Sequence, residues 1–117
     1  MKYLCLAYGS AEDWKELSED ERNALLAQDD VLRERGDLVA AVGLQVTTVR
    51  AWAGTPATSG GPLTETKLPL AGFGIIEAAD LNEAVRVIAD TPCARAKGAV
   101  EIRPITIMSA ASFEEEK

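Results

Sequence analysis

The sequence contains no histidine, which removes the side chain that proteins use most often for acid–base catalysis near neutral pH and for binding zinc. Its two cysteines, Cys5 and Cys93, lie far apart in the chain, so the closely spaced thiols of a structural metal site are missing as well. Carboxylates alone remain as potential ligands for a cation. The sequence therefore predicts no metal site and no bound cofactor.

Long apolar runs and clusters of basic residues are also absent. No apolar run approaches the roughly 20 residues that cross a bilayer, and the first run, Tyr3 to Tyr8, is too short for the apolar region of a signal peptide. The net charge of −7 would repel a phosphate backbone. We therefore expect no membrane and no nucleic-acid partner, and the few thiols favour a reducing, cytoplasmic location.

What the sequence does contain is the composition of an ordinary folded domain. Of its 117 residues, 47% are apolar and 26% are charged, which is close to average globular usage. A chain of this length needs only one core. We predict a single domain over residues 1–108, followed by a flexible acidic tail at 109–117.

The hydrophobic pattern predicts alternating strands and helices. Ser18 and Glu21 form a capping box at the start of the first helix, whose buried stripe is expected to be Leu25, Gln28, Val31 and Leu32. Loops are expected at 9–17 and 54–62. Strands are predicted at 2–8, 37–44, 46–53, 70–78 and 99–108, and helices at 19–35 and from Asp80 to just before Pro92. This order indicates an α+β fold of the ferredoxin-like, split βαβ type, with helices on one face of an antiparallel sheet.

The first predicted strand is apolar on both faces, which conflicts with a sheet that is covered on one side only. Tyr3 and Cys5 alternate with Leu4 and Leu6, so one of these pairs would face water. Each large apolar side chain left exposed forgoes about 1.5–3 kcal/mol. We therefore expect a homodimer in which the uncovered faces of two sheets pack together.

Four segments of the chain resemble, in order and spacing, a known family. They are "TTVR" at 47–50, "SGGPLTETK" at 59–67, "GFGIIEA" at 72–78 and "VEIRPI" at 100–105. Together they resemble the YCII-related proteins of the DGPF-motif branch.

The resemblance is incomplete in the loop that gives the branch its name. That loop typically carries Asp-Gly-Pro-Phe and then a Glu-Thr-Lys-like run. Here Gly60 and Leu63 stand in place of the Asp and the Phe, whereas Gly61, Pro62 and residues 65–67 match.

The resemblance implies a dimeric α+β barrel of ferredoxin-like subunits, in agreement with the argument from the first strand. Members of the wider group are suspected of enzymatic activity because of a histidine–aspartate pair in a cleft, and a chain without histidine cannot supply that pair. Genes of the branch often lie beside genes for extracytoplasmic-function sigma factors, which implies a regulatory role. A sigma factor is therefore a second possible partner.

Four charged residues are the candidates for a ligand site: Arg50, Glu65, Lys67 and Arg103. If Arg50 and Arg103 point into the space between two sheets, they can grip a carboxylate or phosphate, with the Glu65–Lys67 loop closing over it. The competing interpretation is that the four form surface ion pairs worth about 0–1 kcal/mol each. No catalytic residue is predicted, because Glu65 has no evident partner and neither cysteine has a neighbouring base.

Three hypotheses of function follow. The first is a small dimeric YCII-related protein that binds a small anionic or apolar metabolite in a groove at the dimer sheet. The second is a regulatory, protein-binding partner of a sigma factor without catalysis. The third is a cofactor-independent isomerase or oxygenase, which rests on analogy of fold alone. Whether the protein is an enzyme is left open by these residues.

Overall fold

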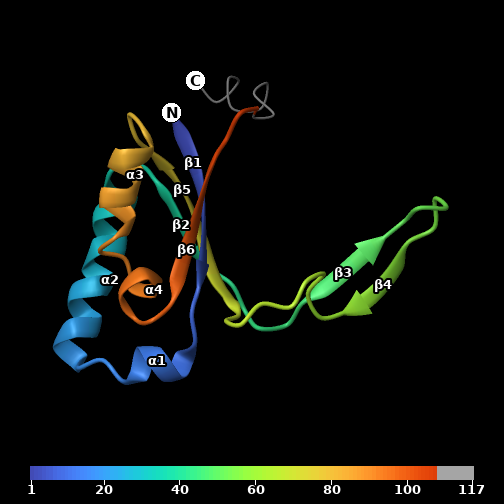
Figure 1. The fold of residues 1–117 in the computed structure, drawn as a ribbon, viewed down its shortest axis with the longest axis horizontal. Coiled ribbons are helices and arrows are strands. Elements are labelled where there is room, and N and C mark those ends of the chain that lie inside the picture. Colours follow the sequence, from blue (N-terminus) through green and yellow to red (C-terminus); the bar gives the residue numbers. More distant parts are fainter. Residues whose placement is uncertain (108–117) are drawn as a thin grey trace.

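The structure is a computed structural model that describes residues 1–107. It contains a four-stranded antiparallel sheet with helices on one face, and a separate two-stranded ribbon (Figure 1). The elements are β1 (Lys2–Tyr8), α1 (Ala11–Lys15), α2 (Glu19–Glu34), β2 (Leu38–Ala41), β3 (Thr47–Arg50), β4 (Ala57–Gly60), β5 (Leu70–Glu77), α3 (Leu81–Ile88), α4 (Pro92–Arg95) and β6 (Ala99–Pro104). The tail predicted at 109–117 lies outside this description.

The main sheet has the strand order β2-β5-β1-β6, and every neighbouring pair is antiparallel. Strands β1 and β5, which begin the two halves of the fold, therefore lie at the centre, and β2 and β6 form the edges. This is the arrangement of a ferredoxin-like, split βαβ fold. The predicted α+β fold class is confirmed.

The core lies between the sheet and the helices. Tyr3 and Cys5 on β1 and Ile76 on β5 are buried together with Ala84 and Ile88 on α3. The alternation predicted for the last strand also holds, because Val100 and Ile102 pack against this core while Glu101 and Arg103 lie on the other face. The helices thus cover only one face of the sheet, as expected.

The inner face of α2 matches the prediction only in part. Of the predicted stripe Leu32 is buried and Leu25 is half-buried, whereas Gln28 is exposed and Val31 is 48% exposed. The residues that face the sheet include Leu26 and Asp29. The prediction was wrong at Gln28 and Val31, because it did not admit the carboxylate of Asp29 on the inner face.

A short helix, α1, occupies part of the segment that was expected to be a loop. The Ser10 hydroxyl caps it by accepting a hydrogen bond from the backbone N–H of Asp13 at 3.1 Å. Five residues are too few to show a hydrophobic period, so the cap was the only available signal.

The strands predicted at 37–44 and 46–53 belong to different sheets. Strand β2 ends at Ala41 and pairs with β5, whereas β3 pairs with β4 in the ribbon. Strand β4 itself lies within the segment 54–62 that was expected to be a loop. We call residues 42–69, which connect β2 to β5 and include the ribbon, the arm.

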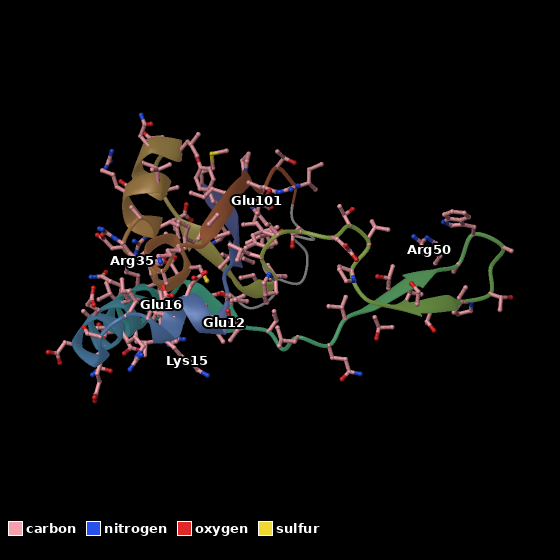
Figure 2. The ribbon with its side chains drawn as sticks, turned by 60° about the horizontal axis from the view of Figure 1, so that its bottom comes forward. Glu12, Lys15, Glu16, Arg35, Arg50 and Glu101 are labelled. Carbon is pink, nitrogen blue, oxygen red and sulfur yellow. The ribbon has the colours of Figure 1, made fainter. Side chains whose placement is uncertain are left out.

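The arm leaves the end of the sheet and extends away from the body of the protein. Figures 1 and 2 both show it on the opposite side of the sheet from the helices. The body is therefore layered as helices, sheet and then an uncovered sheet face, with the arm projecting past that face. Within residues 1–107, no helix is both long and apolar enough to cross a membrane.

Candidate functional site

A cleft of about 860 Å³ opens between the helical layer and the sheet. Its sheet side includes Cys5 and Ala7 of β1 and two glycines of β5, Gly72 and Gly74. A side chain at Gly72 would meet the backbone oxygen of Ala40 at 2.5 Å, so glycine is needed for β2 to lie this close. The same glycines have no side chains to fill the floor of the cleft, which is therefore hollow. They also add no polar group to it, and the lining is mainly apolar.

One carboxylate on the inner side of α2, that of Asp29, lines the cleft, as do the charged side chains of Glu12 and Arg33. Asp29 is half-buried, and burial raises its pKa, with Arg33 opposing that effect and Asp30 adding to it. Arg33 is engaged elsewhere, since its guanidinium binds Asp30 at 3.0 Å. Within residues 1–107 no side chain forms an ion pair or hydrogen bond with Asp29, so its carboxyl group is available to a ligand.

The two thiols that line the cleft are held in their protonated form. Burial raises the pKa of Cys5 to about 11, with a smaller contribution from Asp37. Burial also raises the pKa of Cys93, and the nearby charge of Asp29 raises it further. A thiolate is the nucleophilic form of cysteine, so neither residue is an activated nucleophile at neutral pH.

The link between Asp29 and Cys93 gives a testable expectation. Asp29→Asn removes a negative charge that disfavours the thiolate, so the pKa of Cys93 should fall and its alkylation by iodoacetamide at pH 8 should become faster. Mass spectrometry of the alkylated peptides measures both cysteines in one experiment. Cys5 is the internal control, because its pKa responds to Asp37 and not to Asp29. Equal alkylation rates of Cys93 in the two proteins would show that Asp29 does not act on the thiol.

The face of the sheet that carries no helices, called the bare face below, is a second feature of the body. Its centre consists of half-buried apolar side chains from the two central strands, with Leu6 opposite Phe73 and Leu4 opposite Ile75. Leu38 of the edge strand β2 continues it and is 47% exposed. Exposed apolar surfaces of this kind are typical of protein–protein or ligand-binding sites.

The rim of the bare face carries a short polar network. The Tyr8 hydroxyl donates a hydrogen bond to Glu101 Oε1 at 3.1 Å, and Arg103 Nη2 lies 3.6 Å from the same carboxylate oxygen. Arg103 is therefore partnered on its own strand within a single chain.

The four residues predicted as a ligand site are spread over different parts of the structure. Arg50 lies on the arm, where its guanidinium stacks 5.9 Å from the ring centroid of Trp52 (Figure 2). Glu65 and Lys67 lie in the coil that joins β4 to β5, and Arg103 lies on β6. In the part of the chain that the structure describes, no two of these four form an ion pair with each other.

The cleft and Asp29 were not found by sequence reasoning. A faint signal was available, because Asp29 lies three residues after Leu26 and three before Leu32 and so shares their side of a helix. A carboxylate at such a position is usually read as a break in the apolar stripe. Here it is a half-buried polar group that lines the cleft.

The fold and its two surfaces define a ferredoxin-like α+β domain with an apolar cleft under the helices and a bare sheet face. The chain belongs to the YCII-related family, because the model of the YCII-related domain matches residues 1–109. The resemblance to the YCII-related family noted from the sequence is thus confirmed, and the DGPF-motif branch stays a prediction.

The chain is similar to the solved structure of 5-chloro-2-hydroxyhydroquinone dehydrochlorinase (TftG) from Burkholderia phenoliruptrix AC1100, in complex with 2,5-dihydroxybenzoquinone. That likeness has 18% identity and a TM-score of 0.49 and covers 92% of this chain and 96% of that one. No curated protein matches the chain.

Proposed function

We propose that this YCII-related protein binds a small, mainly apolar molecule in the cleft between its helices and its sheet. The observation that carries the proposal is the cleft itself, whose volume of about 860 Å³ lies within the ~300–1,000 Å³ of small-molecule sites. Such sites combine apolar walls with a few well-placed polar groups. The cleft has this composition.

The polar group of the cleft indicates which ligands fit. Asp29 is half-buried and unpaired by other side chains of residues 1–107, so it favours a ligand with a hydroxyl, N–H or amine donor. Leu26, Leu32 and Val39 offer the apolar walls. The ligand class is therefore a compact apolar or aromatic molecule with one hydrogen-bond donor near one end.

The proposal includes a homodimer formed through the bare face. The half-buried side chains at its centre would be covered by the same face of a second copy, as a two-fold interface requires. A groove at this sheet interface is also where Arg103 could hold an anionic group together with Arg50, Glu65 or Lys67 of either chain. That four-residue site requires two chains, and it is retained here as a proposal of lower rank than the cleft.

A blocking substitution tests the cleft. Ala7 lines the cleft and is half-buried, so Ala7→Phe should fill the cavity without creating an unpaired polar group. The neutral apolar probe N-phenyl-1-naphthylamine becomes more fluorescent when it binds, so a fluorescence titration measures its affinity. We expect Ala7→Phe to lower this affinity at least tenfold, a loss of about 1.4 kcal/mol in binding free energy.

The matched control places the same substitution on the outside of α2. Ala27 is exposed, so Ala27→Phe should leave the affinity for the probe unchanged. Urea unfolding of both variants confirms that each is folded. Equal affinity of Ala7→Phe and wild type would place the probe outside the cleft and overturn the proposal.

A further inference from the structure

The arm carries an unusual share of the exposed apolar surface of the protein. Of the thirteen large apolar side chains that are exposed within residues 1–107, six lie in the arm. Trp52 is 91% exposed, and Leu44 and Leu63 are 80% and 74% exposed. The remaining three are Val42, Val46 and Val49. Exposed apolar side chains gathered in one segment are typical of an interaction site.

The arm also lacks support from its own chain. Strands β3 and β4 pair with each other and, in the part of the chain described, with no other strand. An isolated two-stranded hairpin is at best marginally stable in water, and three strands or a packing partner are needed. The ribbon therefore requires a surface to lie against.

The direction, length and charge of the arm point to that surface. The arm extends on the side of the bare face, where a second copy would pack (Figures 1 and 2). Its outgoing half, residues 42–53, can span up to about 40 Å, whereas packed sheets are only about 10 Å apart. An arm of this length is long enough to reach past such an interface to the body of a second copy.

The charges of arm and body are complementary. The arm contains two cations, Arg50 and Lys67, and one carboxylate, Glu65, so its net charge is +1. Since the whole chain carries −7, the remaining residues carry −8. A cationic ribbon is attracted to an acidic body, and in a homodimer each copy supplies both.

We infer that the arm of each chain packs on the body of a second copy of the same chain, with Trp52 and Val49 against apolar side chains and Arg50 beside a carboxylate. Each subunit would thereby contribute Arg50 and Trp52 to the surface of its partner. The two-chain ligand site proposed above is incomplete without this exchange. The inference rests on the proposed homodimer, and light scattering separates failure of the dimer from failure of the exchange.

A single-tryptophan reporter tests the exchange. The chain has two tryptophans, and Trp14→Phe leaves Trp52 alone on the arm. At concentrations where light scattering reports a dimer, we expect Trp52 emission to be blue-shifted from that of free N-acetyl-tryptophanamide and its acrylamide quenching to be several-fold weaker. A dimer in which Trp52 quenches like the free compound overturns the inference. A wild-type protein that is monomeric overturns it as well. So does equal protection of Trp52 from acrylamide in a variant made monomeric by Leu6→Asp, because the arm would then lie on the body of its own chain.

Dimer affinity provides an independent measurement. Trp52→Ala should raise the dissociation constant of the dimer at least tenfold, because large buried aromatic side chains dominate interfaces. Val85→Ala is the matched control, since Val85 is 50% exposed on α3, on the helical side away from the arm. Val85→Ala should leave the dissociation constant of the dimer unchanged. An unchanged constant for Trp52→Ala contradicts the exchange even if the dimer itself is real.

Discussion

Leu6→Asp is expected to convert the homodimer into a folded monomer at micromolar concentration. Leu6 lies at the centre of the bare face, directly opposite Phe73 on β5 and Glu101 on β6. A two-fold interface would bury two new carboxylates, one from each copy, and each would lie opposite the carboxylate of Glu101, which already engages the nearby Arg103. Burial of an unpaired charge costs several kcal/mol, so the dissociation constant should rise by roughly 100-fold or more.

The effect on the isolated subunit should be small. Leu6 is only half-buried within one chain, so a carboxylate there can reach water in the monomer. Circular dichroism should therefore report a folded protein, while light scattering reports half the mass of wild type. Val85→Asp adds the same charge on the helical side and should remain dimeric. A wild-type protein that is already monomeric and stably folded would overturn the dimer proposal.

The regular part of the fold was predictable because its signals are local. The alternation in β1 and β6 gave the two faces of the sheet, and Ala84 and Ile88 are spaced as one side of a helix, as α3 indeed has them. Ser18 and Glu21 mark the start of α2 through the capping box that the structure contains. Each of these signals depends on residues within a few positions of one another.

The arm was less predictable because strand pairing is not local. Residues 46–53 have the composition of a strand, and β3 does form among them, but nothing in the sequence states that its partner is β4 and not the main sheet. The prediction therefore extended the sheet where the chain leaves it. The candidate residue Arg50 consequently lies on the arm and not beside Arg103.

The cleft was missed for a related reason. It depends on empty space between α2 and the sheet, above Gly72 and Gly74, which have no side chains to fill it. Sequence patterns indicate which residues face inward, but they do not give the distance between layers. Asp29 gains its significance only once that space is known.

Gly98→Ala is expected to lower the free energy of unfolding by about 3 kcal/mol or more, at the upper end of single-substitution effects. Gly98 precedes β6, where the chain passes close to the end of β1. An added Cβ would lie 2.2 Å from the backbone oxygen of Tyr8 and 2.6 Å from that of Cys93. Backbone atoms cannot rotate away as a side chain does, so relief requires the pairing of Tyr8 with Ala99 to open.

Urea unfolding at neutral pH measures the loss, which is a large part of the roughly 5–15 kcal/mol of a typical domain. Gly43→Ala is the matched control, because a Cβ there meets no atom within 4 Å and Gly43 is not among the glycines with positive φ. It should change the free energy of unfolding by no more than about 0.5 kcal/mol. Cys93 and Gly9, which lie beside Gly98, also line the cleft, so Gly98→Ala should weaken binding of N-phenyl-1-naphthylamine as well. Equal stability of the two glycine variants would mean that β1 and the start of β6 are not packed as closely as this structure has them.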